Sequence, residues 1–191
     1  MSLSDIVDNS RTDKNTDHSY LELYQSLLVS KKTSATNILE IGIYNGGSIK
    51  LWYDFFTNAT IYALDIMQLD NVWNELKDNN RIKLHTSIDA YNLENFNAIF
   101  SKEIKFDMVL DDGPHSLESM MQFIRLYSTL LKDDGILIIE DVQDWDWIEL
   151  LKNEVPTELK PFVQVYDLRP IKNRYDDIVF TINKSKSIDL L

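Results

Sequence analysis

Apolar residues along this chain fall either in short continuous runs or at helical spacing, with polar breaks between them. Runs rich in branched and aromatic side chains predict strands, whereas apolar residues three and four positions apart predict amphipathic helices. The predicted strands are 37–43, 60–66, 82–88, 106–110, 135–142, 162–168 and 178–183. The predicted helices are 18–29, 49–56, 71–78, 91–100, 116–131 and 145–153.

Helices alternate with the first five predicted strands, but little helix-forming sequence separates the last two. This order predicts an α/β fold with a doubly wound, mostly parallel, Rossmann-like sheet of seven strands. The last two strands are expected to pair antiparallel as a hairpin. All 191 residues are expected to form one domain, with an N-terminal helical segment at 1–30 and a core at 37–184.

An acidic or glycine element follows each of the five alternating strands. These elements are Gly42 to Gly47, Asp65, Asp89, Asp111 with Asp112, and Glu140 with Asp141. Right-handed crossovers bring the carboxyl ends of such strands to one edge of the sheet, where α/β proteins bind ligands. If the fourth and fifth strands are neighbours, four acidic groups and His115 converge on one crevice.

The glycine turn after the first strand is not a standard dinucleotide fingerprint. In the run from Glu40 to Ser48, Tyr44 stands where G-x-G-x-x-G would have its second glycine. The tyrosine argues against a binding site for a nicotinamide dinucleotide. Asp65, however, lies where an acid can accept hydrogen bonds from ribose hydroxyls. The alternative for the glycine run is a purely structural turn that needs glycine for positive φ. The alternative for Asp65 is an acid that caps a helix or faces solvent.

Composition narrows the class of partner. The formal net charge is −12, from 31 acidic and 19 basic residues, which argues against nucleic-acid binding and against docking on an anionic membrane. The absence of cysteine excludes disulfides and thiolate metal sites. We see no signal peptide and no apolar run near the roughly 20 residues of a membrane span. A cytoplasmic, soluble protein is the expectation.

Several motifs together resemble a known family. They are Thr12-Asp13-Lys14 followed by His18, Tyr20 and Tyr24; LEIGIYNGGSIKLW; ALDI; DDGPH; and IIEDV. The pattern is similar to class I S-adenosylmethionine-dependent methyltransferases. Within that class it is most similar to the macrocin and mycinamicin type sugar O-methyltransferases and their cephalosporin-biosynthesis relatives. The late segment 167–177 also resembles that family.

The resemblance implies roles for the residues at the strand ends. It places the cofactor, S-adenosylmethionine, beside Glu40, Gly42, Gly47, Ser48, Asp65, Asp89, Asp111 and Lys14. It implies that Asp65 holds the ribose hydroxyls and that Asp89 accepts from the adenine amino group. A divalent cation, Mg²⁺ or Mn²⁺, would be bound by Asp112, Glu140 and Asp141. His115 would be the general base that takes the proton of the acceptor hydroxyl.

The chemistry of these residues agrees with methyl transfer to a hydroxyl. Carboxylates hold hard cations, which lower the pKa of a bound hydroxyl, and a nearby histidine can accept its proton. The expected acceptor is a sugar or a sugar-containing small molecule. The alternatives are a phenolic or catechol-like diol on the same site, a nicotinamide-dependent oxidoreductase, and a non-catalytic binding module.

Several of these residues are compatible with a structural role as well as a functional one. The DDGP run is also a good turn sequence, and Ser116 can cap the next helix. Trp145 and Trp147 could be core residues or a platform for a sugar ring, whereas Tyr20 and Tyr24 are read as packing residues. Little sequence is available for a substrate lid, so a partner subunit could supply contacts, and a homo-oligomer is a prediction.

Overall fold

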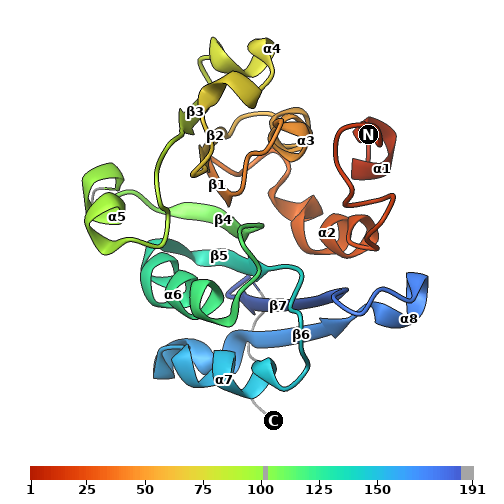
Figure 1. Ribbon diagram of the computed structural model, residues 1–191, viewed down its shortest axis with the longest axis vertical. Helices are drawn as coiled ribbons and strands as arrows, with labels where there is room; N and C mark the ends of the chain where they lie inside the picture. The colour runs from red at the N-terminus through yellow and green to blue at the C-terminus, as the bar shows by residue number, and fades with distance from the viewer. Residues whose placement is uncertain (101–102, 186–191) are drawn as a thin grey trace.

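The computed structural model describes residues 1–100 and 103–185, and its centre is one seven-stranded sheet. The strands lie in the order β3-β2-β1-β4-β5-β7-β6, which Figure 1 shows from top to bottom. Their bounds are β1 Asn37–Ile41, β2 Thr60–Leu64, β3 Ile82–His85, β4 Phe106–Asp111, β5 Leu131–Ile139, β6 Val163–Asp167 and β7 Ile178–Asn183.

The first five strands are parallel, whereas β7 runs antiparallel to both β5 and β6. The predicted doubly wound sheet with a C-terminal antiparallel hairpin is therefore confirmed. The order reverses between β1 and β4, and the two strands pair from Ile38 beside Met108 to Ile41 beside Asp111. In an open α/β sheet, that reversal is where ligands bind.

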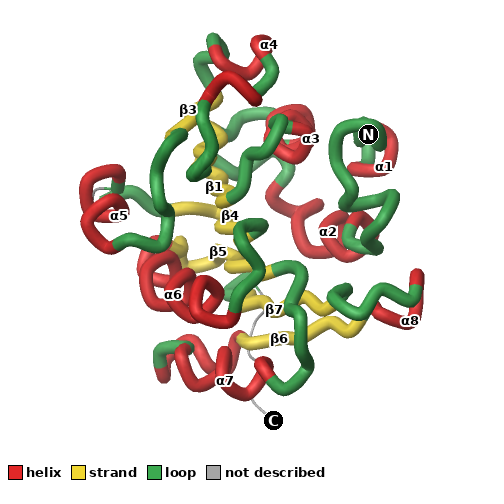
Figure 2. The backbone as a smooth tube through the Cα atoms, in the orientation of Figure 1, coloured by secondary structure: helices red, strands yellow, loops and turns green. Residues whose placement is uncertain are grey.

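Helices cover both faces of the sheet (Figure 2). They are α1 Leu3–Ile6, α2 Leu21–Leu28, α3 Gly47–Phe55, α4 Asn74–Lys77, α5 Leu93–Ile99, α6 Leu117–Tyr127, α7 Trp147–Glu154 and α8 Arg169–Lys172. Short 3₁₀ turns lie at Val29–Lys31, Leu69–Asn71, Ser128–Leu130 and Thr157–Phe162. One apolar cluster packs α1, α2 and α3 on one face, and a second packs α6 and α7 on the other.

The structure corrects three boundaries. The fifth strand was predicted to begin at residue 135, but β5 begins at Leu131 and pairs irregularly with β4 between Phe106 and Met108. The helix predicted to end at residue 131 ends at Tyr127. The polar start of the chain contains a short helix, α1, because Leu3 is buried against α2 and α3. Among the described residues, no helix is long and apolar enough to cross a membrane.

Candidate active site

The predicted acidic and glycine residues meet at the carboxyl ends of neighbouring strands. Asp111 pairs with Ile41 of β1 on one side and with Ile139 of β5 on the other. The next backbone groups continue this alignment, because the Asp112 N–H donates to the Ile41 carbonyl at 2.9 Å. The glycine turn after β1, the DDGPH turn after β4 and the acidic pair after β5 therefore share one edge.

Glycine is needed in the first turn because other backbone approaches too closely for a side chain. Gly42 has a φ of 98°, and a Cβ on it would lie 2.1 Å from the Asp112 carbonyl oxygen. A Cβ on Gly47, the first residue of α3, would lie 1.9 Å from the Arg11 carbonyl oxygen. The glycine turn is thus fitted between the β4 turn and the N-terminal segment, residues 8–24, which crosses over the start of α3.

Asp65, at the end of β2, holds the glycine turn in place. Its Oδ2 accepts the backbone N–H groups of Ile43 at 2.7 Å and Tyr44 at 2.9 Å, and its Oδ1 accepts that of Met67 at 2.8 Å. A carboxylate has about four acceptor positions, so these bonds leave room for a ligand hydroxyl. Asp65 therefore fixes the turn and still presents an acceptor at its surface.

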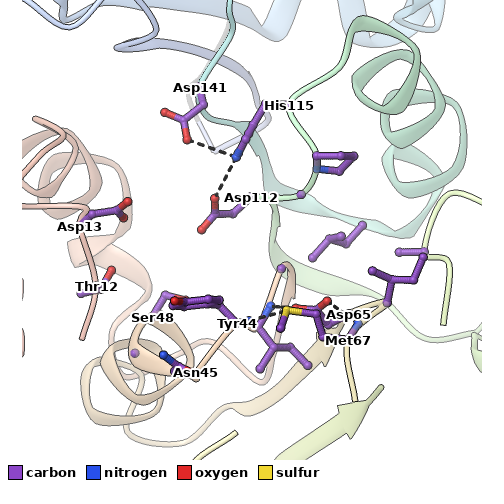
Figure 3. Close-up of a pocket in the computed structure, with 18 of the residues that line it drawn as sticks. Thr12, Asp13, Tyr44, Asn45, Ser48, Asp65, Met67, Asp112, His115 and Asp141 are labelled. Carbon is purple, nitrogen blue, oxygen red and sulfur yellow. Dashed lines mark hydrogen bonds and ion pairs between the residues drawn. The ribbon is translucent and has the colours of Figure 1, made fainter. Parts of the chain in front are cut away.

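A cavity of about 1000 Å³ lies over these strand ends (Figure 3). Tyr44, Asp65 and Met67 are grouped at one end of the view, and Asp112, His115 and Asp141 at the other. The predicted site residues on the cavity wall are Gly42, Gly47, Ser48, Asp65, Asp89, Asp112, His115 and Asp141. Four other predicted site residues of the described chain, Lys14, Glu40, Asp111 and Glu140, lie behind that wall.

The cavity ends at a group of three potential metal ligands. His115 Nε2 lies 3.8 Å from Asp112 Oδ1 and 3.6 Å from Asp141 Oδ2, and Figure 3 shows both contacts. One ligand atom from each of the three residues lies within 4.8 Å of the others. His115 and Asp141 have positive φ values of 52° and 55°, a conformation that costs energy and is concentrated at functional sites.

Glu140, the third predicted metal ligand, points elsewhere. Its Oε1 accepts a short hydrogen bond from Lys14 Nζ, and its Oε2 accepts one from the Tyr24 hydroxyl. Burial, with the nearby charge of Asp112, raises the pKa of Glu140 well above its usual range. The carboxylate of Glu140 is thus held by Lys14 and Tyr24 and does not line the cavity, and its role as a ligand stays a prediction.

Lys14 carries a buried positive charge among three carboxylates. Its Nζ lies 2.7 Å from Asp112 Oδ2 and 3.6 Å from Glu40 Oε1, in addition to its contact with Glu140. Burial alone would lower the pKa of Lys14, but the three acids more than offset this and raise it above its ordinary value. Lys14 therefore acts as an internal counter-ion behind the cavity, a function that its position in the sequence alone did not indicate.

Two predicted cofactor residues have structural partners instead of cavity contacts. Glu40 is fully buried, and its Oε2 accepts from Trp52 Nε1 at 2.7 Å. Asp111 accepts from the Tyr91 hydroxyl, and burial raises the pKa of Asp111 to about 7. Their predicted contact with a cofactor stays a prediction.

Sequence reasoning missed the role of the aromatic residues near the start of α2. Tyr20 and Tyr24 were read as packing residues, but their hydroxyls donate to Asp141 and Glu140. His18 is buried, with Nδ1 2.7 Å from Asp177 Oδ1 and 3.1 Å from Asp141 Oδ1. The four-residue spacing of the tyrosines places them on one helix face, but the sequence does not tell what that face meets.

A doubly wound sheet with a cavity at the point where the strand order reverses defines a Rossmann-like ligand-binding domain. The model of one protein family, described as a methyltransferase domain, matches residues 39–142. The chain belongs to this methyltransferase domain family, which confirms the family resemblance of its motifs.

Known relatives and structures agree with that assignment. Mycinamicin VI 2''-O-methyltransferase of Micromonospora griseorubida is 28% identical over 123 residues, 61% of this chain and 29% of that protein. L-olivosyl-oleandolide 3-O-methyltransferase of Streptomyces antibioticus is 23% identical over 68% of this chain and 34% of that protein. The chain thus spans about a third of the length of these relatives.

The fold also matches solved structures. The MycE methyltransferase of mycinamycin biosynthesis, in complex with Mg, SAH and mycinamycin VI, superimposes with a TM-score of 0.75 at 21% identity. That match covers 96% of this chain and 54% of the MycE chain. At this identity, the match establishes the shared fold.

Proposed function

We propose that this chain is an S-adenosylmethionine-dependent, divalent-cation-dependent O-methyltransferase that acts on a hydroxyl of a sugar or glycosylated small molecule. One observation carries the proposal: a single cavity joins the glycine turn and Asp65 to the group of Asp112, His115 and Asp141. A cofactor at one end and an activated hydroxyl at the other are the two reactants that methyl transfer needs, and proximity supplies much of the rate.

The walls of the cavity suit a nucleoside cofactor. Backbone at Gly42 and Gly47 lies close to the cavity without intervening side chains, and Asp65 presents a free acceptor position to a ribose. Asp89 lies exposed on the same wall, after β3, where an adenine amino group could donate to it. S-adenosylmethionine bound there would supply a methyl group on a positively charged sulfur. The relatives named as O-methyltransferases support this choice.

The other end of the cavity suits a hard divalent cation. The carboxylates of Asp112 and Asp141 face one another beside His115, and carboxylate ligands favour Mg²⁺ or Mn²⁺. Such a cation, bound by Asp112 and Asp141, would lower the pKa of an acceptor hydroxyl. The presence of Mg in the MycE complex supports a cation in this chain.

We assign to His115 the removal of the proton of the acceptor hydroxyl. Its side chain is about a third exposed at the cavity wall, and its Nε2 faces the two carboxylates. S-adenosylmethionine, when bound, would supply the methyl carbon to the hydroxyl oxygen, and its sulfur would keep the electron pair of the broken carbon–sulfur bond. His115 Nε2 takes the hydroxyl proton, so charge balances within the site.

The acceptor is inferred from the relatives and from one exposed side chain that follows Asp141 in the sequence. One relative is named as an O-methyltransferase of L-olivosyl-oleandolide, whose name contains a glycosyl group, and the other as a 2''-O-methyltransferase of mycinamicin VI. Trp145, shortly after Asp141, is 45% exposed, with the Arg169 guanidinium 5.3 Å from its ring centre. Such a ring can stack on a sugar face. Trp147 instead packs against the core.

A thermal-melt screen tests the cofactor. S-adenosylhomocysteine at a hundredfold its dissociation constant should stabilise the native chain by about 2.7 kcal/mol. For a domain of this size, that should raise the melting temperature by about 5–10 °C. A shift with NAD⁺ in place of S-adenosylhomocysteine would overturn the proposal.

Turnover assays test the reaction. Asp112→Ala should abolish cation-dependent methylation and leave S-adenosylhomocysteine binding largely intact, and His115→Ala should lower the turnover number in the same way. Sugar-bearing acceptors should react and catechols should not. Full activity in excess chelator would refute the cation. Light scattering of the purified chain tests the predicted homo-oligomer separately.

A further inference from the structure

Each of the two carboxylates that face His115 has one oxygen held from behind and one turned to the cavity. Lys14 Nζ lies 2.7 Å from Asp112 Oδ2, while Asp112 Oδ1 faces His115. The Tyr20 hydroxyl donates to Asp141 Oδ1, while Asp141 Oδ2 faces His115. Both inner contacts come from the N-terminal segment, so one stretch of chain determines which oxygens the cavity presents.

We infer that Tyr20 is a positioning residue for the cation site, because its hydroxyl fixes the inner oxygen of Asp141 and thereby aims the outer oxygen at the space shared with Asp112 and His115. Lys14 does the same for Asp112. The inference rests on the proposed function, since it concerns the site where a divalent cation would bind.

The surroundings of Tyr20 leave its hydroxyl little freedom. The side chain is fully buried, and its ring stacks on that of His18 with centroids 4.8 Å apart and planes 20° apart. The hydroxyl is also 3.4 Å from the Asp176 carbonyl oxygen. Its two possible acceptors are therefore Asp141 Oδ1 and this carbonyl oxygen. Tyr20 is therefore a fixed donor and not a mobile one.

Asp141 needs such a fixed partner because its backbone does not hold it in a relaxed conformation. Asp141 has a φ of 55°, and a non-glycine residue keeps this strained backbone conformation only where surrounding contacts hold it. Its side chain is held by the Tyr20 hydroxyl and by His18 Nδ1, which lies 3.1 Å from Asp141 Oδ1, and Gln143 Nε2 donates to its carbonyl oxygen at 3.0 Å. Without the hydroxyl, Asp141 can rotate toward His18 and withdraw Oδ2 from the cavity.

Tyr20→Phe is a sharp test because it removes one oxygen and keeps both the ring and the net charge. Loss of a partner behind a metal ligand typically weakens metal binding by about 10–100-fold. Mn²⁺ binding to the full chain, without acceptor, is measured by electron paramagnetic resonance. We expect the dissociation constant for Mn²⁺ to rise by about 10–100-fold in Tyr20→Phe.

Two further variants separate positioning from a general structural effect. Tyr127→Phe removes another buried tyrosine hydroxyl, which donates to the Ala90 carbonyl at 2.7 Å, and it should leave the Mn²⁺ dissociation constant unchanged. In an Asp141→Asn background, Tyr20→Phe should cause little further loss, because the carboxylate through which it acts is already gone. Circular dichroism checks that each variant is folded.

The outcomes are distinguishable. Failure of the unmodified chain to bind Mn²⁺ would overturn the proposed cation dependence, and the inference with it. Binding by the unmodified chain with equal affinity in Tyr20→Phe would overturn the inference alone. If Tyr20→Phe does not fold, Lys14→Arg applies the same test to Asp112. This change keeps the positive charge at position 14 but alters the length and shape of the side chain. Unchanged Mn²⁺ affinity in Lys14→Arg would therefore refute positioning by the N-terminal segment.

Discussion

Replacement of Lys14 by methionine removes the only lysine or arginine that the described chain places among the carboxylates of Glu40, Asp112 and Glu140. Glu40 and Glu140 are both almost completely buried. Methionine fills a similar volume but leaves their negative charge without a partner. The change therefore tests how much a buried counter-ion contributes to the stability of this edge of the sheet.

The expected loss is large because the acids are not solvated. Removal of one partner of a buried ion pair costs about 3–5 kcal/mol, since it leaves an uncompensated charge. For a chain of this length, that lowers the melting temperature by about 6–20 °C. The loss should be greater at about pH 8 than at about pH 6, because burial raises the pKa of Glu40 to about 7 and removal of Lys14 would raise it further.

Urea unfolding, followed by tryptophan fluorescence at both pH values, measures this loss. Lys31→Met is the matched control. The Lys31 side chain is also buried, and its Nζ lies 2.7 Å from Asp134 Oδ2, but the Asp134 side chain is 66% exposed. Because water can solvate Asp134 in the variant, the control should lose only about 0–1 kcal/mol.

Equal losses in the two variants would refute this reasoning. They would mean that Glu40 and Glu140 are neutral in the native chain at both pH values, or that water reaches them. A loss in Lys14→Met that does not change with pH would refute the second step only, namely that the uncompensated carboxylates titrate near neutral pH.

The remaining predictions concern the β4 turn and the glycine turn. Burial raises the pKa of Asp111 from 3.8 to about 7, so the native chain binds a proton that the unfolded chain has lost, and stability falls as pH rises through that interval. Asp111→Asn should flatten this dependence in urea titrations; an unchanged slope would contradict it. Gly42→Ala would place a Cβ 2.1 Å from the Asp112 carbonyl oxygen. It should cost about 2–6 kcal/mol and remove the S-adenosylhomocysteine shift, and a melting temperature equal to that of the unmodified chain would contradict it.

Most of the fold follows from local sequence pattern. Apolar runs located all seven strands of the sheet, and an acidic or glycine element marks the end of the first five; the lack of helix-forming sequence before the last strand predicted the antiparallel pair β6 and β7. These features depend on residues close together in the chain. The predicted start of the fifth strand at residue 135 shows the limit, because Leu131 pairs with Phe106 of β4 and β5 therefore begins earlier in the chain.

The residues along one edge of the sheet were likewise predictable from the sequence, because a parallel sheet with right-handed crossovers brings its strand ends together. The cavity at that edge and the facing of Asp112, His115 and Asp141 agree with this expectation. Only the tertiary structure determined what lies behind them. The Glu140 carboxylate accepts from Lys14 and does not face the cavity. That choice depends on how the N-terminal segment packs across the strand ends.

The sequence by itself therefore determined the element types, the fold class and the list of acidic residues at the site, because each depends on patterns within a few residues. The tertiary structure decided which oxygen of each carboxylate is free. That choice depends on contacts of Lys14 and Tyr20 with residues about a hundred positions away, from Lys14 to Asp112 and from Tyr20 to Asp141. Contacts over such separations arise only when α2 packs against the sheet, and no local pattern encodes them.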